Sequence, residues 1–408
     1  MFDFEKELKK YKRFGSKLGL ERVKKLLELL MHPENNLKII HIAGTNGKGS
    51  TASFIYNILL KAGYKTGLFI SPWVYDYKER MQVNGKHITD EEIERVAKNV
   101  FQKADSMLNE GFESPTEFEI LTGTALSYFS DKNLDYVILE TGLGGRFDST
   151  NIMESPLLTV ITSISFDHIN ELGDSIESIA FEKAGIIKNS VPLIANVKDI
   201  KAKKIIAKIA YEKNAPLIDI SEKKCPLISE IKNARNFPPY QAKNIKTAIY
   251  AVQALKQNNG HKIERKYLIE GILNTDLPGR FDKIKGNIIL DGSHNEAGIA
   301  ELARIIRHEY SDSRILIVIG LLKDKNLPKI LSNLKEISAD YILTTPDTSR
   351  AASISKLKSL MKDRGFNIIA EYCNPSEAIK RAIKYTEKYD LIIGTGSFHL
   401  LRDFRQAI

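Results

Sequence analysis

Short apolar runs alternate with amphipathic stretches along nearly the whole chain. Apolar runs of this continuous kind are typical of strands in a parallel sheet that helices cover on both faces. We therefore expect an α/β fold with a mainly parallel sheet. In the first part of the chain the predicted strands cover residues 65–70, 135–139, 157–161 and 191–195, and the predicted helices cover 90–109, 117–130 and 175–184.

A second α/β segment follows an interruption of this pattern at Pro278 and Gly279, residues that mark a loop. We expect residues 1–278 to form a P-loop domain and residues 279–408 to form a smaller, Rossmann-like α/β domain. The smaller domain has no phosphate loop of its own, so a cleft between the two domains is the expected place for chemistry. Its predicted strands cover residues 287–290, 314–319, 340–343 and 390–393.

The most informative segment covers residues 39–60, where an apolar run leads through a glycine-rich turn into a helical pattern. This order builds a phosphate cradle, because backbone N–H groups and a helix N-terminus attract an anion, and Lys48 adds a full positive charge. The match to the Walker pattern is imperfect, since the glycines are closer together and Gly49 stands where that pattern has Ser or Thr. The alternative is an ordinary glycine-rich turn with a surface lysine.

Polar side chains follow several of the predicted strands. Ser71, Glu140 and His168 lie at such positions, where one crevice beyond the strand ends could gather them with Lys48. Glu140 could hold Mg²⁺ bound to a nucleotide, or could only tether the glycine-rich loop that follows it. His168 is either a metal ligand or a hydrogen-bonding residue. Lys183 ends a predicted helix, where interaction with the helix C-terminus is the simplest explanation.

Composition and charge limit the possible partners. The chain has 408 residues, enough for two domains, and a formal net charge of +9 at pH 7. Its lysines are spread along amphipathic helices, so a solvated surface is the simplest explanation of the positive charge. A more specific explanation is that the charge attracts ATP and an acidic co-substrate. Binding of nucleic acid is the weakest of the three explanations. Cys225 and Cys373 lack metal-ligand spacing. With no secretory signal and no apolar run of membrane-spanning length, we expect a cytoplasmic protein.

An ordered series of short motifs spans essentially the whole chain: Gly44-Thr-Asn-Gly-Lys-Gly-Ser50, Ser71-Pro72 with Glu79-Arg80, Thr116-Glu-Phe-Glu119, residues 139–151 and 162–168, Glu182-Lys-Ala-Gly-Ile-Ile187, Leu277-Pro-Gly-Arg-Phe281 and Asp291-Gly-Ser-His-Asn295. Together these motifs resemble the folylpolyglutamate synthase/dihydrofolate synthase family, within the Mur ligase superfamily. The segment from Phe14 to Leu20 also resembles the opening of that family. The chain departs from the family pattern at Trp73, where histidine often follows Ser-Pro, and at Thr141, which replaces a common valine.

The resemblance implies a role for each matching position. Ser71 and Glu140 match the ligands of a first Mg²⁺, and His168 and Lys183 match those of a second, with Lys183 carbamylated by CO₂. His294 and Ser397 match positions near the incoming glutamate. The implied catalytic residues are Lys48, His168, Lys183 and His294, and the implied ATP-binding residues are Thr45, Asn46, Gly47, Lys48, Gly49, Ser50, Asn244, Arg280 and Asp291.

The implied activity is that of an ATP-dependent amide ligase that adds L-glutamate to folates through an acyl phosphate. Dihydropteroate is implied as a further acceptor of L-glutamate. Its partners would be small molecules, with no nucleic acid and no membrane, and the protein would be a monomer. One alternative is a related Mur-type amino-acid ligase with a non-folate acceptor. Another is a nucleotide-driven switch or nucleic-acid motor, which would leave the polar strand ends of the second domain without a role.

Overall fold

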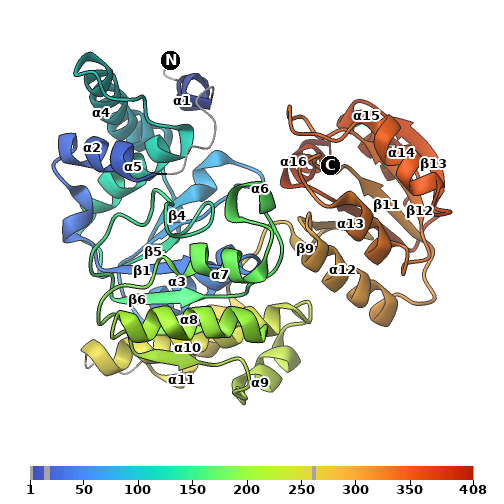
Figure 1. Ribbon diagram of the computed structural model, residues 1–408. Coiled ribbons are helices and arrows are strands. Elements are labelled where there is room, and N and C mark those ends of the chain that lie inside the picture. Colours follow the sequence, from blue (N-terminus) through green and yellow to red (C-terminus); the bar gives the residue numbers. More distant parts are fainter. Residues whose placement is uncertain (1–2, 13–18, 260–262, 408) are drawn as a thin grey trace.

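Two α/β lobes lie side by side in the computed structural model, which describes residues 3–12, 19–259 and 263–407 (Figure 1). Residues 14–18 of the segment from Phe14 to Leu20 lie outside this range. The N-terminal lobe is built on an eight-stranded sheet in the order β4-β3-β2-β5-β1-β6-β7-β8. Its strands are β1 (Ile39–Ala43), β2 (Thr66–Phe69), β3 (Met81–Val83), β4 (Lys86–His87), β5 (Tyr136–Glu140), β6 (Leu158–Ile161), β7 (Leu193–Ala195) and β8 (Leu217–Asp219).

In the sheet, the neighbouring strands β2-β5-β1-β6-β7-β8 are all parallel. At the other edge, β3 and β4 pair antiparallel. Every residue of β1, β5 and β6 is buried, which explains why their sequences are continuously apolar. The predicted strands are confirmed with ends shifted by one or two residues. Since parallel strands end at one edge of the sheet, the loops after β1, β2, β5 and β6 converge there.

Helices cover both faces of this sheet, as the continuous apolar strands require. One core cluster contains α3 (Lys48–Lys61), α10 (Gln241–Asn259) and α11 (Arg265–Leu273). The opposite cluster contains α1 (Phe4–Lys12), α2 (Glu21–Leu29), α4 (Asp90–Asn109) and α5 (Glu117–Ser130). The remaining helical elements of this lobe are α6 (Ile169–Leu172), α7 (Ile176–Ala184), α8 (Ile200–Glu212), α9 (Leu227–Ala234), and the 3₁₀ turns Pro33–Asn36 and Tyr77–Arg80.

Side-chain caps fix the starts of the predicted helices. Thr89 and Thr116 each accept a hydrogen bond from the backbone N–H three residues on, and a glutamate at that position closes a capping box. Ser175 caps α7 in the same way with Ser178. The helices predicted at 90–109 and 117–130 therefore begin and end where the pattern indicated, and the third begins one residue later.

The C-terminal lobe has a six-stranded sheet in the order β13-β12-β11-β14-β10-β9. Its strands are parallel except for β9, which pairs antiparallel with β10. The predicted boundary at 278/279 falls between α11 and β9. The elements are β9 (Arg280–Lys285), β10 (Ile288–Asp291), α12 (Glu296–Glu309), β11 (Ile315–Ile319), α13 (Leu327–Leu334), β12 (Asp340–Thr344), α14 (Ile354–Lys362), β13 (Asn367–Tyr372), α15 (Pro375–Ile383), β14 (Leu391–Thr395) and α16 (Phe398–Ala407).

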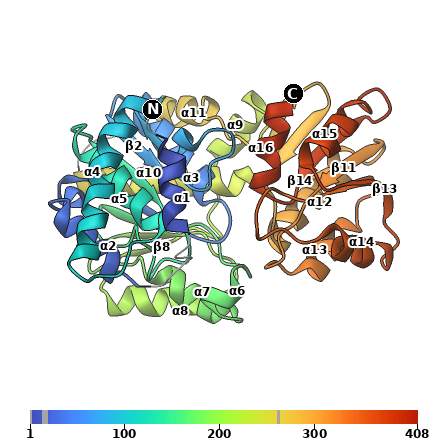
Figure 2. The ribbon, with the colours of Figure 1, turned by 90° about the horizontal axis from the view of Figure 1, so that it is seen from above.

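The loop after β2 belongs to the N-terminal lobe and contacts the C-terminal lobe. Val74 of this loop is buried within an apolar cluster of the C-terminal lobe, and the Tyr75 hydroxyl donates a hydrogen bond of 2.7 Å to Asp282. From above, α16 lies on the side of the C-terminal lobe that faces the N-terminal lobe (Figure 2). Among the described helices, none has the length and apolarity needed to cross a bilayer.

Candidate active site between the lobes

The glycine-rich turn links the end of β1 to the start of α3. Gly47 caps α3 with φ of +83°, and a Cβ there would lie 2.1 Å from Oδ1 of Asn244, so only glycine fits. The loop after β6 supports the turn, since the Thr45 N–H donates to the Ser163 carbonyl (2.8 Å) and the Asn46 N–H to the Ser163 hydroxyl (3.0 Å). The result is a rigid turn at a helix N-terminus, as a phosphate cradle requires.

Two lysines meet at this turn. The Nζ atoms of Lys48 and Lys183 donate hydrogen bonds of 3.2 and 2.9 Å to the carbonyl oxygen of Gly44. Lys183 lies in the last turn of α7 and is buried. Burial, with a smaller contribution from Lys48, lowers the pKa of Lys183 to about 7. A large fraction of its amine is therefore uncharged near neutral pH.

Glu140 and Ser71 lie beside the same turn. The Ser71 N–H donates a 2.9 Å hydrogen bond to Oε2 of Glu140, and Lys48 Nζ lies 4.0 Å from Oε1. Burial raises the pKa of Glu140, against the opposing effect of Lys48. A Cβ at Gly49 would lie 3.2 Å from Oε2, so the carboxylate occupies the space that a Ser or Thr after Lys48 would need.

His168 starts the short helix α6 with φ of +51°, and its ring lies 3.9 Å from Oδ2 of Asp167. Burial lowers the pKa of His168 to about 3, so its imidazole is neutral. The Asp167 carboxyl is also buried, which raises its pKa, but His168, His294 and Lys325 outweigh this effect and lower it.

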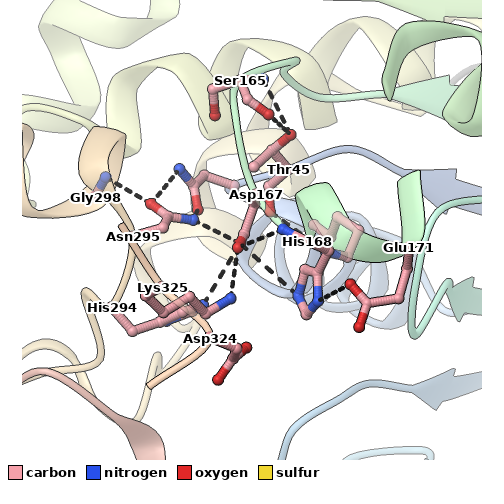
Figure 3. Close-up of polar contacts among 12 residues, drawn as sticks. Thr45, Ser165, Asp167, His168, Glu171, His294, Asn295, Gly298, Asp324 and Lys325 are labelled. Atoms are coloured by element: carbon pink, nitrogen blue, oxygen red, sulfur yellow. Dashed lines mark hydrogen bonds and ion pairs between the residues drawn. The ribbon is translucent and has the colours of Figure 1, made fainter. Parts of the chain in front are cut away.

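Asp167 is the main polar link between the lobes (Figure 3). Its Oδ1 accepts from Nζ of Lys325 at 2.5 Å, and its Oδ2 accepts from Nδ2 of Asn295 at 2.9 Å. Asn295 also exchanges two amide hydrogen bonds with Asn46 of the glycine-rich turn, at 3.0 and 3.2 Å. Lys325 was not among the predicted site residues, because it lies in a loop after β11 with no motif around it.

Six of the predicted ATP-binding residues line one cavity of about 280 Å³: Asn46, Gly47, Ser50, Asn244, Arg280 and Asp291. Asp291 is buried, which raises its pKa, and accepts a 3.0 Å hydrogen bond from the Tyr240 hydroxyl. Asn244 donates to the Gln241 side chain at 2.8 Å, and Gln241 donates to the Ser50 hydroxyl at 3.2 Å. The motifs indicated neither Tyr240, which lines this cavity, nor Gln241, which holds the lining residues Asn244 and Ser50.

A second cavity, of about 410 Å³, has walls from both lobes and contains Ser71, His294 and Ser397. The buried Ser397 hydroxyl accepts from the Leu400 N–H at the start of α16. His294 Nδ1 donates to the Gly292 carbonyl at 2.8 Å, and burial lowers its pKa to about 4, so its Nε2 carries a lone pair.

A smaller cavity of about 110 Å³ lies between these two, and the turn at residues 45–49 lines it together with Ser71, Glu140, His168 and Lys183. His294 lines all three cavities, so they adjoin one another at this residue. Among the described residues, no group of three or more His, Cys, Asp or Glu side chains forms a metal cluster. The central cavity instead offers a carboxylate, a serine hydroxyl and an imidazole. Carboxylate and hydroxyl oxygens suit Mg²⁺, which keeps several of its waters.

Comparison with known proteins shows the family of the chain. Residues 42–247 match the Mur ligase middle domain, and residues 279–398 match the glutamate ligase domain of Mur ligases. The chain is 35% identical to the dihydrofolate synthase/folylpolyglutamate synthase of Bacillus subtilis (strain 168), over 97% of this chain and 96% of that protein. The chain belongs to the dihydrofolate synthase/folylpolyglutamate synthase family.

Solved structures of this family share the fold of both lobes. The chain aligns to E. coli FolC in complex with DHPP and ADP with a TM-score of 0.84 and 29% identity, covering 98% of this chain and 96% of that chain. It aligns equally well to a bifunctional folylpolyglutamate synthase/dihydrofolate synthase with Mn, AMPPNP and L-glutamate bound, with 28% identity over 99% of this chain and 97% of that one. The α/β fold expected from the sequence is confirmed.

Proposed function

We propose that this protein is an ATP-dependent ligase that joins L-glutamate to the free carboxylate of a folate, and also to that of dihydropteroate. The observation that carries this proposal is the row of three cavities that meet at His294, between a glycine-rich turn and a second lobe. A reaction with three substrates needs three adjoining sites whose reacting atoms meet at one point.

The 280 Å³ cavity at Asn244, Arg280 and Asp291 is the proposed site of the adenosine part of ATP. The phosphates then reach the turn at residues 45–50, where Lys48 leaves the Gly44 carbonyl to contact them. The 410 Å³ cavity receives the acceptor and the incoming glutamate, the latter beside His294 and Ser397. The domain assignment of residues 1–278 and 279–408 is part of this proposal.

The donor set of the central cavity fits two Mg²⁺ ions. Ser71 and Glu140 would hold the first, and His168 and a carbamylated Lys183 the second. The lowered pKa of Lys183 supports carbamylation, because only an uncharged amine reacts with CO₂, and the carbamate offers the oxygen ligands that an amine lacks. When bound, the metal ions offset the repulsion between the phosphates and the acceptor carboxylate.

The reaction has two steps. The acceptor carboxylate attacks the γ-phosphorus of ATP, giving an acyl phosphate and ADP, and Lys48 stabilises charge on the transferred group. The amine of L-glutamate then attacks the acyl carbon and phosphate leaves. Nε2 of His294 is the proposed acceptor of the amine proton, because Nδ1 is committed to Gly292 and the imidazole is neutral. The closed lobes exclude water, which would hydrolyse the acyl phosphate.

The test is an assay of the purified protein with ATP, labelled L-glutamate and either dihydropteroate or tetrahydrofolate, with products resolved by mass. We expect one added glutamyl residue per ADP formed with each acceptor. Product from a cell-wall precursor but from neither pteridine acceptor would support a Mur-type ligase with another substrate. ATP turnover that needs no glutamate and responds to DNA or RNA would support a nucleotide-driven motor. The proposed monomeric state is measured by light scattering on the same sample.

A further inference from the structure

The pairing of Trp73 with Arg402 is a contact between the lobes that the mechanism above does not use. Trp73 lies in the loop after β2. Arg402 lies on α16, the helix on the side of the C-terminal lobe that faces the N-terminal lobe (Figure 2). The Arg402 guanidinium carbon lies 3.0 Å from the centre of the indole ring. A guanidinium over an indole face is held in place by cation–π attraction, so this arginine is fixed in orientation.

Arg402 is fixed but not neutralised. Within the described residues its side chain forms no ion pair or hydrogen bond and its Nε is buried without a partner, so carboxylates such as Asp403 and Glu79 act on it only at longer range. Arg80 also lines this cavity, and its Nη1 is likewise buried without a hydrogen-bond partner. Burial is the main cause of the lowered pKa of Arg80. The carboxylates of Glu117 and Glu140 oppose this effect without hydrogen-bonding to the guanidinium, whereas Arg402 lowers the pKa further, so the two cations lie close enough to repel one another. Two buried donors that lack acceptors cost free energy unless an anion meets them.

The 410 Å³ cavity is lined by apolar side chains, among them Phe118, Leu121 and Phe147, and by the guanidinium groups of Arg80 and Arg402 beside Trp73. Neither Trp73, Arg80 nor Arg402 lines the nucleotide cavity or the central cavity. The ATP phosphates therefore do not reach these guanidinium groups, and the anion that does is a second group on the acceptor or on the amino acid.

We infer that Arg402, stacked on Trp73 and assisted by Arg80, binds a glutamyl carboxylate that does not itself react. This inference rests on the proposed function, which supplies a glutamyl carboxylate from two sources: the tail of an acceptor that already carries glutamate, or the incoming L-glutamate. A planar guanidinium matches a carboxylate through two parallel N–H donors.

Kinetics of Arg402→Gln test the inference, with the concentrations of L-glutamate, monoglutamyl tetrahydrofolate and dihydropteroate varied in turn. Loss of one hydrogen-bonded charge pair predicts a rise in one KM of about ten- to a hundredfold, with little change in kcat. A rise for the monoglutamyl acceptor but not for dihydropteroate supports the acceptor tail as the source. A rise for L-glutamate with either acceptor supports the incoming amino acid. All three KM values within about twofold of wild type would overturn the inference.

Arg405→Gln is the matched control, because Arg405 lies on the same helix and over Tyr75 of the same loop, but outside the cavity. The Arg405→Gln variant should behave as wild type. Arg402→Lys keeps the positive charge but loses the two parallel N–H donors of the guanidinium, so it should give an intermediate KM.

Trp73 is the only tryptophan of the chain, so its fluorescence reports this contact without catalysis. Saturating L-glutamate or monoglutamyl tetrahydrofolate, each with ADP present, should shift its emission in wild type and in Arg405→Gln but not in Arg402→Gln. No shift with either ligand in wild type would contradict the subsite. Wild-type protein that shows the shift but joins glutamate to neither acceptor would contradict the proposed function instead.

Discussion

Lys325 of the C-terminal lobe and Asp167 of the N-terminal lobe form a buried ion pair, with 2.5 Å between Nζ and Oδ1. The two side chains are only 4% and 7% exposed. The pair lies beside His168, so it joins the second lobe to the edge of the central cavity. Because a buried charge that loses its partner typically costs about 3–5 kcal/mol, removing either side chain should disfavour the closed arrangement of the lobes.

We predict that Lys325→Met lowers kcat/KM by about a hundredfold or more and increases the radius of gyration measured by small-angle X-ray scattering. The reason is that Asp167 then keeps its charge in a closed interface without its cation. Lys329→Met is the control, because Lys329 reaches Phe166 across the interface but its side chain is 55% exposed. Equal kinetics and equal dimensions for Lys325→Met and Lys329→Met would exclude this role.

Lys183→Ala should retain the fold and lose ligation, because it removes the proposed carbamate. With ¹³C-labelled bicarbonate, NMR of the wild type should show a carbamate carbon signal that the variant lacks. The pKa of about 7 places the reactive amine within the working pH range, so wild-type activity should fall in buffer freed of CO₂ and return on its addition. Full activity of the wild type without CO₂ would remove the carbamate from the mechanism.

Glu140→Gln should raise the Mg²⁺ concentration needed for half-maximal activity and lower turnover with it. The amide keeps the size of the side chain and its hydrogen bond from the Ser71 N–H, but removes the negative charge that a metal ion requires. Activity is measured against Mg²⁺ concentration at saturating ATP. Metal dependence identical to the wild type would place Glu140 outside the metal site.

His294→Asn should lower kcat by about a hundredfold to ten-thousandfold, the range for loss of a general base, with the KM for ATP little changed. Asparagine can still donate to the Gly292 carbonyl but has no basic nitrogen. In the wild type, the rate should rise with pH from about 4 as His294 loses its proton, and this limb should be absent in the variant. A variant with the same limb would assign the proton transfer to another group.

His41 links the stability of the N-terminal lobe to pH. It is buried in β1, with Nε2 2.8 Å from the Thr150 hydroxyl, and burial lowers its pKa to about 3. The unfolded chain takes up a proton at His41 below pH 6.5 whereas the folded chain does not, so the free energy of unfolding falls as the pH falls through this range.

In urea denaturation between pH 6 and pH 4, His41→Gln should therefore remove about 1.4 kcal/mol per pH unit from the slope of this free energy. A variant with the wild-type slope would show that other groups carry the acid sensitivity. The absolute stability at pH 7.5 is a separate quantity, which the loss of the Thr150 contact also changes.

The sequence indicated most of the buried framework, because strands such as β1 and β11 are buried at every residue and so are apolar throughout. It did not indicate β9 or β13, whose sequences Arg280–Lys285 and Asn367–Tyr372 mix charged and apolar residues because each lies at a sheet edge and is only partly buried. Lys325 and Arg402 were missed for a different reason. Their partners, Asp167 and Trp73, are 158 and 329 positions away in sequence and become adjacent only after the lobes meet.

All three cavities draw their walls from both lobes, and this sharing has a consequence for how a glutamate tail would lengthen. A movement that parts the lobes uncovers the spent nucleotide and the extended product together, and fresh ATP cannot enter without such a movement. We therefore expect tail growth to be distributive, with the product set free into solution after each round rather than retained for the next.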